Sequence, residues 1–150
     1  MRIWKISAGE HSKYWRNFVN GELAAFGAWD EGDLRHYHDE KELFQRMNTY
    51  SINNRGKGTT SHIEAWNFYK SIDTGSLLLL YQKGKILALG YVIGNYDYNE
   101  ENVFDGEHYY HVRSTKWKLL DVSKQKLSPH LINSLSKPSD TIYEIEKAIS

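Results

Sequence analysis

Residues 23–34, Leu-Ala-Ala-Phe-Gly-Ala-Trp-Asp-Glu-Gly-Asp-Leu, pass from an apolar run into an acidic loop around a single tryptophan. The run Leu23 to Trp29 predicts a strand, and Gly27 marks the point where its backbone opens. A large aromatic side chain at a strand end can present one ring face to a pocket, where it favours a nucleobase or a methylated ammonium. The alternative is that Trp29 packs in the core, as aromatic residues more often do.

The length and composition of the chain limit the class of protein to which this stretch can belong. The 150 residues indicate one domain, 1–150, either complete or the N-terminal part of a longer protein. Basic and acidic residues number 19 each, so the chain lacks the basic excess on which non-specific nucleic-acid binding depends. Five Trp, eleven Tyr and five Phe favour a stacking site, and the absence of cysteine excludes disulfides and thiolate chemistry. Without a long apolar run or a signal-peptide pattern, we expect a cytoplasmic protein with no membrane partner.

Apolar periodicity and turn residues predict an α+β fold. Strands are expected at 2–6, 23–29, 76–81, 85–96 and 108–120; helices at 7–20, 39–50, 60–70 and 141–149; a flexible segment at 51–58; and a short irregular or helical piece between Pro129 and Pro138. Capping boxes at Ser7/Glu10 and Asp39/Glu42 support two of the helices. Gly90 and Gly94 indicate bends in the longest strand. The expected architecture is a curved mixed β-sheet or partial barrel flanked by helices.

Motifs for catalysis are missing, so we expect a binding domain that is not an enzyme and uses no cofactor. Residues 55–60 resemble part of a phosphate-binding loop, but the upstream glycine and the preceding strand are absent. No nucleophile elbow occurs, and no carboxylate pair stands out. His36 and His38 could bind a metal beside Asp33 or Asp39, but this spacing in an irregular segment is more typical of surface residues. No metal site is therefore predicted.

Basic residues gather in three places from which they could contact phosphates. These are Arg55 and Lys57 in the predicted flexible segment, Lys83 and Lys85 at the hairpin turn, and Arg113, Lys116 and Lys118 along the last strand. The alternative for each of them is a solvated surface.

A series of aromatic and glycine motifs carries a family resemblance. The motifs are Ile3-Trp4-Lys5-Ile6, Lys13-Tyr14-Trp15, Phe26-Gly27-x-Trp29 with Gly32-Asp33-Leu34, Ala65-Trp66-x-Phe68-Tyr69, Leu89-Gly90-Tyr91-Val92-x-Gly94-x-Tyr96-x-Tyr98, and Lys116-Trp117. Over residues 1–120 the chain resembles the N-terminal DNA-recognition domains of McrB-type modification-dependent restriction systems. These are similar to the EVE and YTH-like groups of the PUA-like superfamily, so the resemblance implies a PUA-like fold.

The resemblance also implies a set of base-binding residues, because YTH-like domains hold N6-methyladenine in an aromatic cage. Gly27-Ala28-Trp29 stands where the first cage tryptophan follows the second strand, and Tyr96 and Tyr98 are the candidates for a second wall. Asp30 could accept the remaining N6–H. Ser7 to His11 corresponds to a segment with polar contacts, although Ser-Ala-Gly-Glu-His differs from the family's Asn-rich stretch.

The implied function is binding of DNA that contains a modified base, most simply N6-methyladenine, by flipping that base into the cage. Such a domain would target a restriction complex whose motor domain or nuclease subunit lies elsewhere. Two alternatives stay open: a YTH- or PUA-like reader of modified RNA, and a protein-interaction module whose aromatic residues are core.

Overall fold

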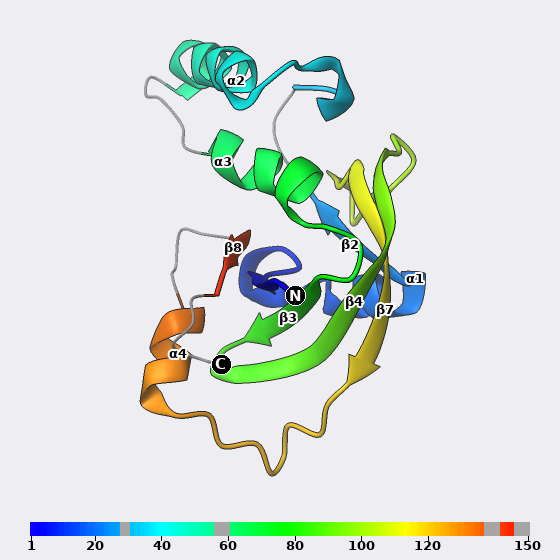
Figure 1. Ribbon diagram of the computed structural model, residues 1–150, viewed down its shortest axis with the longest axis vertical. Coiled ribbons are helices and arrows are strands. Elements are labelled where there is room, and N and C mark those ends of the chain that lie inside the picture. The colour runs from blue at the N-terminus through cyan, green and yellow to red at the C-terminus, as the bar shows by residue number, and fades with distance from the viewer. Residues whose placement is uncertain (28–30, 56–60, 137–141, 146–150) are drawn as a thin grey trace.

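The computed structural model describes residues 1–27, 31–55, 61–136 and 142–145 (Figure 1). Its elements are β1 (Ile3–Ile6), η1 (Glu10–Ser12), α1 (Trp15–Gly21), β2 (Leu23–Phe26), η2 (Leu34–His36), α2 (Glu40–Arg55), α3 (Ser61–Trp66), η3 (Asn67–Ser71), β3 (Leu77–Gln82), β4 (Lys85–Tyr98), β5 (Val103–Phe104), β6 (Glu107–His108), β7 (His111–Leu119), α4 (Pro129–Leu135) and β8 (Ile142–Glu144). The fold is α+β, as predicted. None of the described helices is long and apolar enough to cross a membrane.

A curled sheet forms a half-barrel at the centre of the molecule. Its six strands lie in the order β2-β7-β4-β3-β1-β8, with β1 parallel to β3 and every other neighbouring pair antiparallel. Strand β4 is long and strongly curved in Figure 1. Its register against β7 shifts between Val92 and Tyr96, an irregularity that lets a strand bend. The predicted curved, mixed sheet is therefore confirmed.

The sheet has a hydrophobic cluster on each face. The inner face packs against α1, α2 and α3, and its largest buried side chains include Trp4, Phe18, Phe68, Leu78 and Leu80. The outer face carries a smaller cluster that α4 covers, built from Leu79, Tyr81, Ile86, Leu135 and Ile145. Burying one such large apolar side chain stabilises the fold by about 1.5–3 kcal/mol.

Several predicted features are present. Lys83 and Gly84, with φ of 43° and 86°, form the tight turn between β3 and β4, because both positions of a type I′ turn need positive φ. Asp39 Oδ1 accepts a hydrogen bond from Glu42 N at 2.9 Å at the start of α2. Along β7 the side chains alternate as predicted, with His111 and Arg113 buried on the inner face.

The segment after β1 is not the single helix that its capping box predicted. A short 3-10 turn, η1, comes first, and α1 begins only at Trp15. Gly9, His11 and Ser12 have φ of 81°, 52° and 53°, and left-handed residues cannot continue a right-handed helix. The Ser12 hydroxyl instead donates to the carbonyl oxygen of Tyr81 at 2.6 Å, which fixes this turn to the end of β3.

Two other local predictions were wrong. Residues 51–55 continue α2 instead of forming a flexible segment, and Ser51 is buried; residues 56–58 lie outside the described residues. Ile142–Glu144 form strand β8, where a terminal helix was predicted. This strand pairs with the open edge of β1, and its β-branched and aromatic residues suit that position.

Candidate functional site

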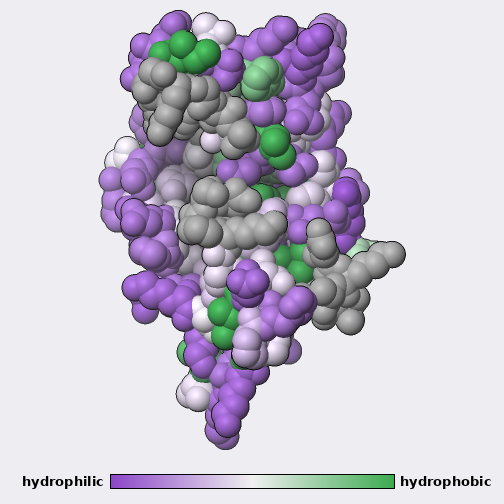
Figure 2. All heavy atoms as spheres, turned by 90° about the vertical axis from the view of Figure 1, so that its left-hand side faces the viewer, coloured by the Kyte–Doolittle hydropathy of each residue, from purple (hydrophilic) through white to green (hydrophobic). Residues whose placement is uncertain are grey.

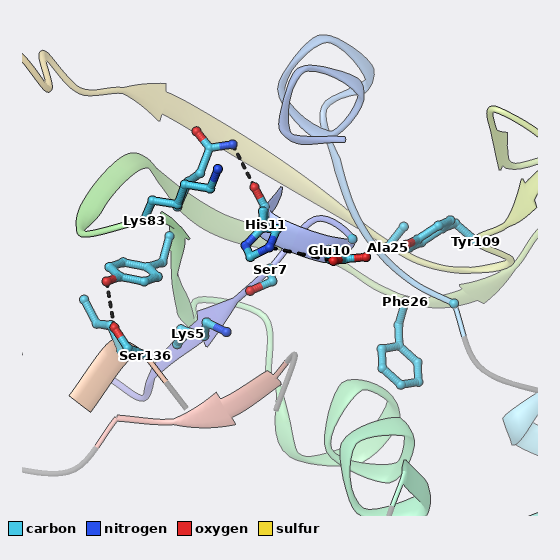
Figure 3. A pocket seen from close by; sticks show the side chains of 14 residues that line it. Lys5, Ser7, Glu10, His11, Ala25, Phe26, Lys83, Tyr109 and Ser136 are labelled. Atoms are coloured by element: carbon cyan, nitrogen blue, oxygen red, sulfur yellow. Dashed lines mark hydrogen bonds and ion pairs between the residues drawn. The ribbon is translucent and has the colours of Figure 1, made fainter. Parts of the chain in front are cut away.

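A cleft of about 680 Å³ lies where three strands end (Figure 3). The parallel strands β1 and β3 end at the same edge of the sheet, a place where ligands commonly bind. The cleft is lined by Ser7 and Gly9–His11 after β1, by Ala25–Gly27 at the end of β2 and by Tyr81–Lys83 at the end of β3, together with Lys5, Tyr109, Leu135 and Ser136. Its volume falls within the range of roughly 300–1,000 Å³ that is usual for small-molecule sites.

Two lysines and one carboxylate line the cleft. Lys5 on β1 is only 4% exposed, and its Nζ lies 5.3 Å from the centre of the Tyr143 ring. Lys83 and His11 are exposed, and Ser7 is half-buried. Glu10 supplies the one carboxylate among the lining residues, with its Oε1 3.7 Å from His11 Nε2. The two lysines suit a ligand that presents hydrogen-bond acceptors.

Two glycines allow the walls of the cleft to approach closely. A Cβ atom on Gly9 would lie 2.8 Å from Tyr14 Cδ2, and one on Gly27 would lie 2.7 Å from the carbonyl oxygen of His108. Gln82 Nε2 donates to the carbonyl oxygen of His11 at 2.7 Å, which ties η1 to the end of β3. The backbone on both sides of the cleft is therefore held in place without any ligand.

Tyr109 is a cleft residue that the sequence analysis did not identify. Its ring packs 5.0 Å from that of Phe104 and 5.5 Å from that of Tyr14. Burial raises the pKa of Tyr109 to about 12, and the nearby Glu107 adds to the effect. Tyr14 donates a hydrogen bond to the Glu107 carboxylate, which raises the pKa of Tyr14 to about 12. The strand predicted at 108–120 included Tyr109, whereas β7 begins only at His111 and leaves Tyr109 just before it.

The structure brings some of the predicted base-binding residues together. Ser7 and His11 line one cleft together with Gly27, the first residue of the Gly27-Ala28-Trp29 motif. Trp29 and Asp30 lie outside the described residues. Glu31, the next described residue after them, is buried, and its Oε1 accepts a hydrogen bond from His111 Nε2 at 2.5 Å.

Tyr96 and Tyr98, the candidates for the second wall, do not line this cleft. Tyr96 is 7% exposed, and its hydroxyl lies 3.1 Å from Leu34 N and 2.7 Å from His111 Nδ1. Burial raises the pKa of Tyr96 above its ordinary value. The Tyr98 ring is half-buried and packs 5.4 Å from the His111 ring. Both tyrosines therefore belong to the aromatic packing around His111.

The basic residues that were predicted to contact phosphates lie in different parts of the structure. Lys83 is exposed at the cleft, and Lys116 and Lys118 are exposed on the outer face of β7. Lys85 Nζ donates to the carbonyl oxygen of Gln125 at 2.7 Å. Arg55 is the last residue of α2, and Lys57 lies outside the described residues.

Arg113, in contrast to these lysines, supports the fold from inside. It is 4% exposed and donates to the carbonyl oxygens of Gly94 and Ile72 at 2.9 and 2.5 Å. Burial lowers the pKa of Arg113 from its ordinary value. These bonds tie β4 to the segment that follows η3, so Arg113 is a structural residue.

The residues near His36 and His38 have structural partners. The Asp33 carboxylate binds the Arg35 guanidinium at 2.7 Å, and this hydrogen bond lowers the pKa of Asp33. Asp39 caps α2. Within the described ranges, no group of three or more His, Asp or Glu side chains could hold a metal ion.

The profile of a family described as a domain of unknown function, DUF8426, matches residues 4–146. The matched span includes every segment that lines the cleft. A comparison with curated proteins found no match.

Proposed function

Since the chain belongs to DUF8426, a family of domains without an assigned function, we propose from the cleft itself that it binds a modified base of DNA, flipped out of the duplex. The observation that carries this proposal is that one cleft gathers Ser7 and His11 with Gly27, which is two residues from Trp29 in the sequence. The resemblance to YTH-like domains implies base contacts by Ser7 and His11, and it places Gly27 in the motif that leads to Trp29. N6-methyladenine is the modified base that this resemblance favours.

In such a site, the free energy gained by stacking is comparable with the cost of flipping the base. Flipping a base out of the stack costs a few kcal/mol, and stacking on an aromatic side chain returns about 1–3 kcal/mol per base. The aromatic ring of Tyr109 lies at the cleft. Trp29 is proposed as the second ring, and Asp30 as the acceptor for the N6–H. Tyr109 would then take the place first considered for Tyr96 and Tyr98.

Contacts to the DNA backbone would come from the exposed lysines. Lys83 lies at the cleft, and Lys116 and Lys118 project from the outer face of β7. With a net charge of zero the domain would bind any single site weakly. Assembly with a motor domain or nuclease subunit would raise the effective affinity by multivalency.

Two other features support the proposal. The half-barrel with its parallel β1–β3 pair and helices on both faces is compatible with the PUA-like fold that we infer. Figure 2 shows a mostly hydrophilic face on which hydrophobic residues form small, separate groups. That face offers little to the alternative of an apolar protein-docking surface.

The test is a comparison of two duplexes that differ only in one N6-methyladenine, with binding measured by fluorescence anisotropy. We expect tighter binding to the methylated duplex and loss of this preference in Trp29→Ala. As a control, Tyr91→Ala removes an aromatic side chain that is 51% exposed on β4, and should keep the preference.

Equal affinity for the two duplexes would overturn the proposal. Tighter binding to methylated single-stranded RNA would assign the cleft to an RNA reader instead. Absence of binding to either nucleic acid would favour the protein-interaction module.

A further inference from the structure

Lys5 is an unusual residue to find in the wall of a cleft. Lysine is almost never fully buried, yet Lys5 is 4% exposed. Its neighbours on β1, Trp4 and Ile6, point to the inner face, so Lys5 points to the outer face between Leu79 of β3 and Tyr143 of β8. From there it reaches the cleft, as Figure 3 shows.

The cleft therefore has basic side chains at different depths. Lys83 and His11 are exposed and so lie at the mouth, whereas the burial of Lys5 places its ammonium in the interior. A nucleotide that enters base first keeps its phosphates at the mouth. The groups in the interior then meet the edge of the base.

The chemistry of the ammonium restricts what that edge can present. Lysine carries three donors and no acceptor. A partner must therefore offer a lone pair, such as a ring nitrogen or a carbonyl oxygen, and an N–H edge is repelled. The titratable side chains facing the same space are Glu10, His11, Lys83, Tyr81 and Tyr109, and of these Glu10 is the one anion.

We propose that Lys5 recognises the flipped base by donating a hydrogen bond to one of its acceptor atoms, which in N6-methyladenine is a ring nitrogen. This inference rests on the proposed function, because it assumes that a base occupies the cleft. It makes Lys5 a residue that determines which base edge is accepted. Lys83 would contact the backbone and add affinity without base preference.

The test uses methylated duplexes in which the target N6-methyladenine is replaced by its 1-deaza, 3-deaza or 7-deaza analogue. Each analogue exchanges one ring nitrogen for C–H. In the wild-type chain, one analogue should weaken binding about tenfold or more, because a hydrogen bond to a charged donor is lost. In Lys5→Met, which keeps the length of the side chain, that same analogue should bind no worse than the parent duplex.

Two further variants complete the experiment. Lys5→Arg retains a cationic donor and should keep the sensitivity to the analogue, which also guards against a folding defect in Lys5→Met. Lys83→Met should weaken all duplexes equally and lower the slope of log affinity against log salt by about one phosphate contact.

The outcomes separate the two proposals. If the wild-type chain binds methylated and unmethylated duplexes equally, the proposed function fails and the role of Lys5 fails with it. If the wild-type chain keeps its preference but Lys5→Met remains as sensitive to every analogue as the wild type, only the role of Lys5 is overturned. A lower salt slope in Lys5→Met with unchanged analogue sensitivity would make Lys5 a phosphate contact and also overturn it.

Discussion

The Glu31 carboxylate and the His111 imidazole form a buried hydrogen bond, 2.5 Å from Oε1 to Nε2, that joins the end of the acidic loop to strand β7. The other ring nitrogen of His111 lies 2.7 Å from the Tyr96 hydroxyl, which also accepts from Leu34 N. With a neutral imidazole that carries its proton on Nε2, each hydrogen in this chain has an acceptor. Glu31, the first described residue after Trp29 and Asp30 in the sequence, is thus anchored by a row of buried polar groups.

Removal of the carboxylate should destabilise the fold. In Glu31→Ala the buried Nε2–H loses its acceptor, and leaving such a group unsatisfied costs about 1–3 kcal/mol. Urea unfolding followed by tryptophan fluorescence measures the change. Glu101→Ala, at an exposed position, is the control and should alter stability by no more than about 0.5 kcal/mol. Equal midpoints for the two variants would show that the buried pair contributes nothing.

Tyr96→Phe distinguishes packing from base binding. The variant keeps the ring but removes the hydroxyl between Leu34 N and His111 Nδ1, so we expect a loss of about 1–3 kcal/mol in unfolding free energy. Because Tyr96 does not line the cleft, the ratio of affinities for methylated and unmethylated duplexes should stay as in the wild type. A ratio that falls to one in a folded variant would restore Tyr96 to the base-binding site.

Gly9 should be far less tolerant of substitution than another glycine with positive φ. Gly9 has φ 81° and ψ −174°, a region that is essentially restricted to glycine, and a Cβ there would also meet Tyr14. Gly84 has φ 86° with open space around it. Gly9→Ala should therefore lower the melting temperature clearly more than Gly84→Ala. In Gly84→Ala, only the left-handed backbone conformation is unfavourable, which lowers the free energy of unfolding by about 1–2 kcal/mol. Equal losses would mean that the close approach to Tyr14 can relax.

Alkaline pH should weaken the fold through Tyr14 and Tyr109. The pKa of each is raised from an ordinary 10.0 to about 12, so the folded state holds these protons more tightly than the unfolded state. The stability they contribute is complete below about pH 10 and is lost as the pH rises towards about 12. Denaturant unfolding over this range should show a shallower decline in Tyr109→Phe than in the wild type. If the free energy of unfolding declined equally with pH in both proteins, the raised pKa of Tyr109 would be contradicted.

Local patterns were sufficient for much of the fold. The β3–β4 hairpin, the α2 cap and the alternation along β7 each depend on residues close together in the sequence, and all were predicted. The failures depend on distant partners. Ile142–Glu144 form a strand because the edge of β1 is available to them, and helical spacing alone could not reveal that partner. The break after β1 depends on the Ser12–Tyr81 hydrogen bond, which spans 69 positions in the chain.

The sequence indicated part of the candidate site, and the structure supplied the rest. Ser7 and His11 were indicated by the family resemblance and Lys83 by its place at the hairpin turn, whereas the parallel pairing of β1 with β3, which brings them to one edge of the sheet, was not predicted. Tyr96 and Tyr109 are both aromatic residues near β7, and the sequence does not say which ring packs against His111 and which faces the cleft. Lys5 alternates with apolar neighbours, so its burial depends on the cover that Tyr143 and α4 provide.

The lysines of β7 should contribute salt-dependent affinity without base preference. Lys118 pairs in register with Leu89, Leu89 with Leu79 and Leu79 with Lys5, so Lys118 lies on the same face of the sheet as the cleft lysine. A DNA backbone that follows this face could reach Lys116 and Lys118 together. The double variant Lys116→Gln/Lys118→Gln should lower the salt slope by about two phosphate contacts and leave the methylation ratio unchanged. Lys41→Gln on α2, at an exposed position in another part of the molecule (Figure 1), is the matched control and should keep the wild-type slope. If the double variant also keeps that slope, the DNA backbone does not cross this face.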